Sequence, residues 1–319
     1  MGAKVERIGE QIGKNIEWWV KTFLGETGLT LNRVSPGLSE KLYNILPLLV
    51  EPIGSVKNLK FAIRTILEAK GEVVTEDKIR GLTQETTRNF IVSVVEFLSV
   101  LREQADWPKF IEPEISDEVK DFFSHKGIIA SFHSGNPLAA ANFLNKLLSQ
   151  GSDVPRKRMA AFLERQPAIL QKPLISFANS FGFVPIFVEE INEKPLEMIR
   201  KIQEIPFLVT LFDRPPKEKN SAVEVKFFGK PALFLGEPAR LSLSLGRPIL
   251  PAAVVKVCEG CYTAEIGKII FPEEYRKTGD KKETVKAITQ AVVLELEPII
   301  ARHPTSFYSF FERFWVEQG

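Results

Sequence analysis

The stretch GIIASFHSGNPLAAANFLNKLL, residues 127–148, decides the fold. An apolar run of strand length ends just before His133, and the chain has only three histidines. A turn of small residues follows, and then an alanine-rich segment of helical character. A strand, a turn and a helix in this order are typical of a parallel sheet, which binds ligands beyond the carboxyl ends of its strands. We therefore expect His133 to lie at a ligand-binding edge.

The segments after this stretch alternate in type: strands at residues 156–163, 183–190 and 206–213, and helices at 171–182 and 195–205. This alternation predicts the α/β class, with a mostly parallel, doubly wound sheet flanked by helices. We interpret the polar residues 214–227 as a mobile loop over the cleft. We expect a helix at 237–245, and two helices or one bent helix at 281–316, interrupted near His303 and Pro304.

We predict three regions: a helical N-terminal region at 1–115, an α/β core at 116–275, and C-terminal helices packing on the core at 276–319. In the first region, residues 5–23 have apolar side chains at helical spacing, with Trp18 and Trp19 next to lysines. Such a helix suits a membrane interface as well as packing on its own domain. We also expect a helix that is capped near Thr83.

Composition limits the possible functions. The net charge of +2, from 42 basic and 40 acidic residues, gives no global field for binding nucleic acid. No apolar run reaches the length of a membrane span, and the N-terminus lacks a signal-peptide core, so we expect a cytoplasmic location. The two cysteines, Cys258 and Cys261, form a lone CxxC that does not indicate a metal site. We interpret it as a thiol pair in a hairpin turn, with a disulfide as the alternative.

Acidic residues also follow the predicted strands. Asp213 and the pair Glu189–Glu190 come at strand ends, as His133 does, so a shared cleft is expected. Gly135 and the alanines after it leave room for a substrate beside the imidazole, and the start of the helix favours an anion. A histidine placed there can act as general base on an alcohol that attacks a thioester. The alternative is a histidine with a structural role.

Basic residues gather in the same half of the chain. They are interpreted either as a solvated face or as a surface for the phosphates of a phospholipid headgroup, coenzyme A or phosphopantetheine. These residues are Arg156, Lys157, Arg158, Arg165, Arg214, Lys217, Lys219, Lys226 and Lys230.

Four motifs in order carry a resemblance to a known family. They are HSGNPL at 133–138, FFG at 227–229, KPALFLGEPARLSLSLGRPILP at 230–251, and RHPTSFYSFFERFW at 302–315. In sequence and spacing they resemble the bacterial lipid A biosynthesis acyltransferase family, which comprises lauroyl and myristoyl transferases and related phosphatidylinositol mannoside acyltransferases. The resemblance covers about residues 126–315.

The resemblance implies an O-acyltransferase bound peripherally at the cytoplasmic face of the inner membrane. It would move a fatty acyl chain from acyl carrier protein or acyl-CoA to a hydroxyl of a lipid or glycolipid, without a metal or another cofactor. His133 matches the catalytic histidine of the family. The residues predicted to bind substrate are Gly135, Asn136, Arg165, Asp213, Phe228 and Gly229.

One departure from the family motif concerns the acid partner of the histidine. The family has a carboxylate five positions after the histidine, and this chain has Leu138 there. Because geometry rather than sequence position makes a dyad, Glu164, Glu189 or Asp213 could stand in for it. The alternative is a catalytically inactive relative that binds acyl lipid or a protein partner.

Overall fold

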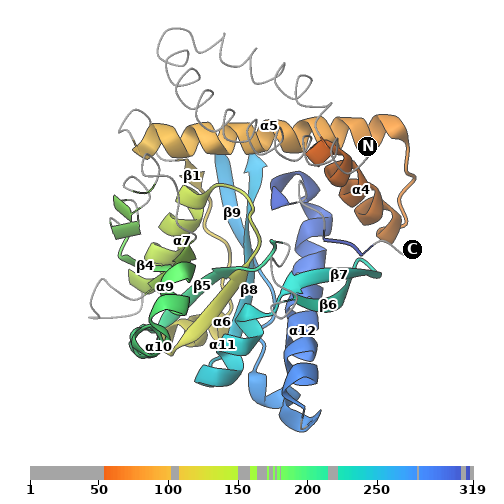
Figure 1. Ribbon diagram of the computed structural model, residues 1–319. Helices are drawn as coiled ribbons and strands as arrows, with labels where there is room; N and C mark the ends of the chain where they lie inside the picture. The colour runs from red at the N-terminus through yellow and green to blue at the C-terminus, as the bar shows by residue number, and fades with distance from the viewer. Residues whose placement is uncertain are drawn as a thin grey trace, which may run out of the picture.

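The protein is described by a computed structural model. The described residues are 54–101, 108–149, 159–163, 171, 175–176, 178–179, 181–214, 222–278, 280–309 and 314–316. They form a central sheet of seven strands with helices on both faces (Figure 1). The predicted α/β class is therefore confirmed. The predicted helix at 5–23 lies outside the described residues, and the region boundaries at 115 and 275 stay predictions.

The sheet is mostly parallel. Its order is β1 (Lys109–Phe110), β9 (Cys261–Ile266), β8 (Ile249–Cys258), β2 (Gly127–Ser131), β5 (Phe207–Leu211), β3 (Met159–Leu163) and β4 (Phe183–Phe187). The five strands from β8 to β4 run parallel. Only β9 runs antiparallel to its neighbour β8, and β1 pairs with β9 in parallel. The carboxyl ends of β8, β2, β5, β3 and β4 therefore meet at one edge.

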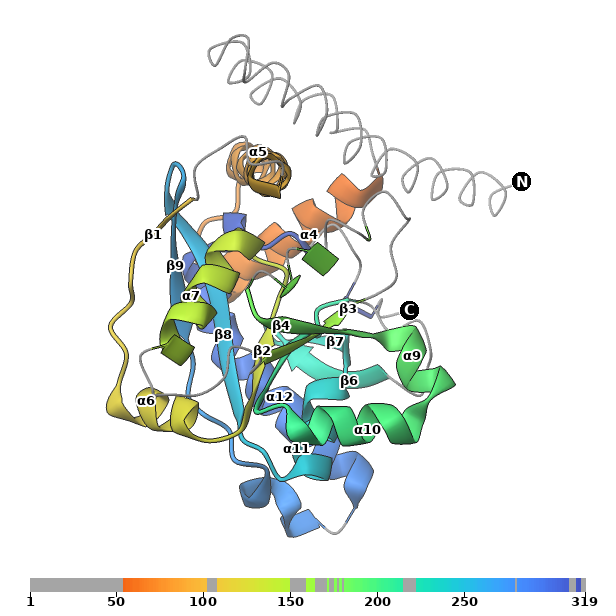
Figure 2. The ribbon, with the colours of Figure 1, turned by 90° about the vertical axis from the view of Figure 1, so that its left-hand side faces the viewer.

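Alternating side chains of the strands supply two cores. Ile129 of β2 packs with α6 (Asp117–Ser124) and α7 (Pro137–Ser149) on one face. Ile128 and Ala130 pack on the other face. That face is covered by α4 (Gly54–Ala69), α10 (Pro195–Glu204), α11 (Glu237–Leu245) and α12 (Lys281–Arg302). Figure 2 shows α7 and α12 on opposite sides of β8.

Helix α5 (Glu76–Leu101) runs across the carboxyl end of the sheet (Figure 1). It begins with two acidic residues, which suit the positive end of the helix dipole. The expected cap near Thr83 is wrong, because Thr83 is buried inside the helix and its hydroxyl donates to the Ile79 carbonyl. Among the described residues, no helix is long and apolar enough to cross a membrane.

The structure also differs from the sequence prediction at residues 183–190 and 214–227. The strand expected at 183–190 ends at Phe187, and α9 (Val188–Glu193) follows it. The expected loop contains β6 (Ala222–Phe227), which forms an antiparallel hairpin with β7 (Lys230–Leu235). In β6 the valines and the phenylalanine are buried, whereas the glutamate and the lysine are exposed, which is the alternation of a half-buried strand.

The described C-terminal segment is extended rather than helical. Helix α12 follows a 3₁₀ turn, η2 (Pro272–Thr278), and ends at Arg302 as predicted; a short 3₁₀ turn, η3 (Pro304–Ser306), follows it. Phe307 then bridges to Ser134, and Trp315 bridges to Ala232. A second helix is thus wrong for the described residues of this segment, which instead ties the β6–β7 hairpin to the turn after β2.

Phenylalanines fill the space under that turn. Phe132, the last residue before His133, stacks on Phe234 with ring centroids 5.6 Å apart. Three more rings surround it at centroid distances of 5.1, 6.0 and 6.3 Å: Phe212, Phe227 and Phe307. All five rings are buried. The residue before the histidine is therefore anchored from four sides, and large aromatic contact areas of this kind stabilise a core strongly.

The two cysteines lie at the turn between β8 and β9. Gly260, inside this turn, has a φ of +64°, which favours glycine. Cys258 and Cys261 form a disulfide across the turn. The predicted position in a hairpin turn is confirmed. The interpretation as a pair of free thiols is wrong, and the alternative of a disulfide is the one that the structure shows.

Candidate active site

Strand register places His133 next to Asp213. β2 and β5 are parallel and pair residue for residue from Gly127 with Phe207 to Ser131 with Leu211. The offset is 80 positions throughout, and it continues two residues beyond the strands, where His133 meets Asp213. The two residues therefore come together because two neighbouring strands of equal length end in register.

The carboxylate of Asp213 accepts two hydrogen bonds from the same histidine. Its Oδ2 accepts the backbone N–H of His133 at 2.6 Å, and its Oδ1 lies 2.7 Å from the ring Nδ1. An ionised carboxylate only accepts hydrogen bonds, so Nδ1 has the proton and Nε2 has the free lone pair. The ring is thus fixed in orientation and in tautomer, and Nε2 is left to act on a substrate.

The two members of the pair differ in exposure. The Asp213 side chain is fully buried, whereas 32% of the His133 side chain is exposed. Burial alone raises the pKa of Asp213, but the charge of His133 and the hydrogen bonds that it donates outweigh burial. The net pKa lies below the usual value for aspartate, so the carboxylate stays ionised. The nearby Ser309 hydroxyl also lowers the pKa of Asp213, although its position does not meet the geometry of a hydrogen bond.

The turn after His133 is held on several sides. Gly135 has a φ of +56°, and a β-carbon there would lie 2.4 Å from the Val254 carbonyl oxygen. Its N–H donates to the Ser306 carbonyl at 2.9 Å, and its carbonyl accepts the Ser93 hydroxyl at 2.9 Å. Only glycine fits this position, so its described contacts are structural; binding of substrate by Gly135 stays a prediction.

Asn136 caps helix α7. It is fully buried, and its side-chain oxygen accepts the Leu138 N–H at 2.8 Å. Its carbonyl accepts the Ala140 N–H, and Pro137 has no N–H to offer. We expected the start of α7 to favour an anion. Most of its N–H groups instead donate to Asn136 or are absent at Pro137. Leu138 is fully buried, so the position of the family carboxylate faces the core.

The other candidate acids are placed differently. Glu189 lies in the first turn of α9, after β4. β4 is three strands from β2, which corresponds to about 14 Å at the usual strand spacing. Of the three candidates, Asp213 therefore contacts His133, and the strand order keeps Glu189 away. Glu164, like the predicted substrate-binding residue Arg165, lies outside the described residues.

Phe228 and Gly229 form the tip of the β6–β7 hairpin. Both have positive φ, of 49° and 75°, and this conformation is strained for a phenylalanine. The Phe228 N–H donates to Glu297 of α12 at 2.7 Å. The pKa of Glu297 is raised, because the effect of burial is larger than the opposite effect of this hydrogen bond. Strained residues gather at functional sites, which supports the prediction that this turn contacts substrate, although its role stays a prediction.

The predicted basic surface is only partly described. Lys230 is engaged with α4: its ammonium donates to Thr65 and Glu68 at 3.1 and 3.0 Å and lies over the ring of Phe61. The ammonium of Lys230 therefore joins the β6–β7 hairpin to α4. Arg214 and Lys226 are described, whereas the remaining basic residues of that set lie outside the described part of the chain.

Sequence reasoning missed the groups that α5, β9 and the segment after η3 bring to the turn. Glu96 of α5 accepts the Asn136 side-chain N–H at 2.6 Å and the Tyr262 hydroxyl at 2.8 Å. The Tyr308 N–H donates to the His133 carbonyl at 2.9 Å. These residues are distant in sequence from His133. The one available signal was the spacing of polar residues within the otherwise apolar half of α5.

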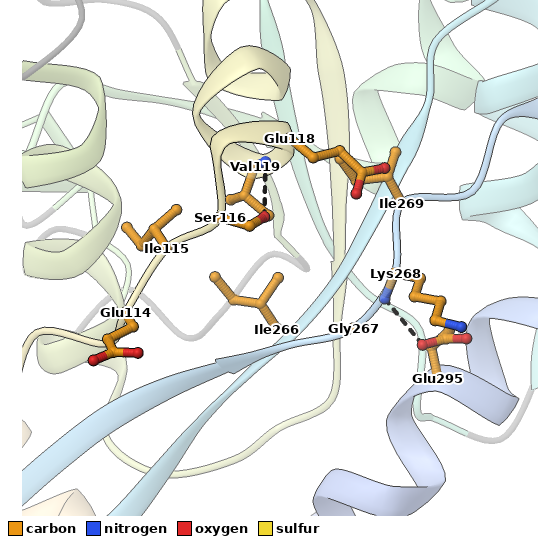
Figure 3. A pocket seen from close by; sticks show the side chains of 10 residues that line it. All are labelled: Glu114, Ile115, Ser116, Glu118, Val119, Ile266, Gly267, Lys268, Ile269 and Glu295. Carbon is orange, nitrogen blue, oxygen red and sulfur yellow. Dashed lines mark hydrogen bonds between the residues drawn. The ribbon is translucent and has the colours of Figure 1, made fainter.

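The structure also has a second pocket, and Figure 3 shows the side chains that line it. It has a volume of about 320 Å³ and lies between the start of α6 and the segment after β9. Because β9 is antiparallel to β8, this segment lies at the amino ends of the parallel strands. Ser116 caps α6 there, and Glu295 accepts the Lys268 N–H. The pocket is therefore distinct from the His133 site.

Fold and site together define a class of protein. It is an α/β protein whose histidine and aspartate, at the carboxyl ends of neighbouring parallel strands, leave one imidazole nitrogen open for proton transfer. Residues 76–315, well over half of the chain, match the model of the family described as bacterial lipid A biosynthesis acyltransferase. The chain therefore belongs to this family, as its motifs predicted. A comparison with curated proteins finds no match.

Proposed function

We propose that the protein is an O-acyltransferase that esterifies a lipid or glycolipid hydroxyl, with His133 as general base. The family supports acyltransferase activity of the lipid A type. The observation that supports the mechanism is the His133–Asp213 pair, in which the protonated Nδ1 faces a buried carboxylate and Nε2 is free. The departure at Leu138 does not remove the acid partner, because Asp213 supplies it from the next strand.

In the proposed reaction, Nε2 of His133 accepts the proton of the acceptor hydroxyl as its oxygen attacks the thioester carbonyl. Asp213 stabilises the imidazolium that forms. The tetrahedral intermediate then collapses: the carbon–sulfur bond breaks, the ester remains, and the imidazolium returns the proton to the thiolate. Proton and charge balance over the cycle, and the protein needs no further cofactor.

The donor, the acceptor and the location are parts of the same proposal. The donor is acyl carrier protein or acyl-CoA, and the protein works peripherally at the cytoplasmic face of the membrane. Support for the membrane comes from the sequence of residues 5–23, with its neighbouring tryptophans and lysines. Support for a phosphate-bearing donor comes from the basic residues that gather in the same half of the chain as His133.

The test is an acyl-transfer assay with defined substrates. Purified full-length protein is mixed with a C12 acyl thioester of either coenzyme A or acyl carrier protein, and with vesicles that contain phospholipid and glycolipid acceptors. New ester is measured by mass spectrometry. We expect ester from the wild type and only background from His133→Ala. Equal background from both proteins would contradict the proposal.

The same preparation tests the alternative of an inactive relative. Lipids extracted from the purified protein are identified by mass spectrometry. An inactive binder would retain acyl lipid in both the wild type and His133→Ala, without producing ester from either. An enzyme would produce ester only with the histidine present.

A further inference from the structure

Helix α5 has a polar stripe toward the His133 turn. Asn89, Ser93 and Glu96 are spaced by four and three residues, so they lie on one face of the helix. α5 lies across the carboxyl end of the sheet, above β8 and β9 (Figure 1). The stripe therefore faces the edge where the histidine–aspartate pair lies.

Each residue of the stripe contacts the turn or a segment bonded to it. The Asn89 side chain donates to the Thr305 carbonyl at 3.2 Å, and Thr305 immediately precedes the residue that accepts the Gly135 N–H. Ser93 donates to the Gly135 carbonyl. Glu96 accepts from Asn136. The helix thus contacts two successive residues of the turn.

The carboxylate of Glu96 joins three elements at a single atom. Its Oε2 accepts the Asn136 side-chain N–H at 2.6 Å and the Tyr262 hydroxyl at 2.8 Å. These partners belong to the cap of α7 and to β9, and both are fully buried. Replacing this oxygen with an apolar group would leave two buried donors unsatisfied, which is costly in a dry interior.

The same bond determines how the amide of Asn136 points. Its oxygen must face the Leu138 N–H, so its nitrogen faces Glu96. Without an acceptor at Glu96, the amide loses one of the two contacts that fix its rotation. Asn136 lies three residues after His133, and the chain between them has no regular secondary structure of its own. Loss of the contact therefore loosens the turn that presents the imidazole.

A carboxylate is costly in this place. Burial raises the pKa of Glu96, and this exceeds the lowering by the Tyr262 and Asn136 hydrogen bonds and by nearby Lys256; Glu259 raises it further. The protein thus keeps an acidic group at a junction where its charge is disfavoured. The geometry explains why an acceptor oxygen stands here, because one oxygen accepts the hydrogen bonds of Asn136 and Tyr262 at once.

We propose that Glu96 is a positioning residue: its carboxyl group, held between Asn136 and Tyr262, fixes the turn that presents His133 to Asp213. The proposal rests on the proposed function in one respect, that His133 is the general base of acyl transfer. Glu96 itself does not touch the reacting atoms; it acts through Asn136.

The test compares Glu96→Ala with Glu96→Gln in the full-length protein. The glutamine keeps an oxygen that can accept both hydrogen bonds, whereas the alanine removes it. We expect Glu96→Ala to lower kcat per folded molecule at least ten-fold, with KM for the acyl thioester within two-fold of the wild type. Glu96→Gln is expected to stay within three-fold in both constants. Asp77→Ala is the matched control, because Asp77 is an exposed acid in the first turn of the same helix and pairs with Arg80 of that helix; it should change neither constant.

A second readout does not need catalysis. The chain has three histidines, His125, His133 and His303, so a spectrum of protein labelled with ¹⁵N-histidine is simple to assign with His133→Ala. The N–H proton between His133 and Asp213 should weaken in Glu96→Ala and persist in Glu96→Gln. His303, which contacts Glu265, is the internal reference and should not change.

The two readouts separate two kinds of failure. Absence of transfer by the wild type would contradict the proposed function, and the spectrum would still test Glu96. A wild-type kcat and an unchanged His133 signal in Glu96→Ala would overturn the positioning role. If Glu96→Ala does not fold, Tyr262→Phe removes one hydroxyl only; it should change the same signal in the same direction, and an unchanged signal would then overturn the proposal.

Discussion

The carbonyl oxygen of Val254 lies where the β-carbon of any larger residue at position 135 would have to go. The distance from that β-carbon would be 2.4 Å, and the backbone of Gly135 is also left-handed. β8 therefore supports the turn after His133 from below, and the turn cannot move toward the sheet.

Gly135→Ala should consequently destabilise the protein by about 3 kcal/mol, from left-handed strain and from the clash with β8 backbone. Gly229→Ala is the matched control. Gly229 has a φ of +75° but open space around the added β-carbon, so only the strain of about 1 kcal/mol applies. Urea unfolding measures both values. Equal losses for the two variants would contradict the contact with Val254.

The identity of the acid partner can be tested by removing each candidate charge. Asp213→Asn should lower kcat by about 10²–10⁴-fold, because the tautomer is no longer fixed and the imidazolium is unsupported. Glu189→Gln should have wild-type activity, since Glu189 follows a strand three positions away. Initial rates of acyl transfer measure both effects. A large loss in Glu189→Gln with little change in Asp213→Asn would reverse the assignment.

Restoring the carboxylate of the family motif should not improve this protein. Leu138 is fully buried, so Leu138→Glu places an acid in the core and should cost about 3 kcal/mol or more. Leu138→Met keeps the volume and should cost less than about 1.5 kcal/mol. Thermal unfolding and the transfer assay check both variants. A higher kcat in Leu138→Glu would show that the site lacks this carboxylate.

Stability in acid should depend on Asp213. Its pKa is lower in the folded protein than in the unfolded chain, so the unfolded chain binds more protons in acid. The contribution of the pair is therefore fully present above a pH of about 4 and is lost as the pH falls through the lower folded pKa. Denaturant unfolding between pH 6 and 3 should show a steeper loss for the wild type than for Asp213→Asn. Parallel curves would contradict the lowered pKa.

Local sequence signals predicted the parts of the fold that depend on apolar runs. β2 and β5 are short and apolar, and α11 lies between a glycine at each end, so their positions agreed with the prediction. The β6–β7 hairpin was missed because its charged residues on the outer face concealed the alternation of its buried valines. The extended segment after His303 was missed because its partners, Ser134 and Ala232, are far away in sequence.

The candidate site was predicted in part: its histidine was named, but its acid partner was left open. His133 and Asp213 could be named because both follow apolar runs, but three acids remained possible, since strand order cannot be read from one sequence. The order β2–β5–β3–β4 distinguishes Asp213 from Glu189, whereas Glu164 lies outside the described residues. Glu96 and Tyr262 were not predicted, because they reach the turn only through the crossing of α5 over β9, and the spacing of polar residues in α5 does not show what they face.

The pairing of β2 with β5 also limits how the gene can change. Apolar side chains along these strands can be exchanged at modest cost when their volume is kept, but a codon gained or lost in either strand would shift every later residue by one position. Asp213 would then face Phe132 or Ser134 instead of the imidazole. The number of residues in β2 and β5 therefore matters more for the site than the identity of each side chain in these two strands.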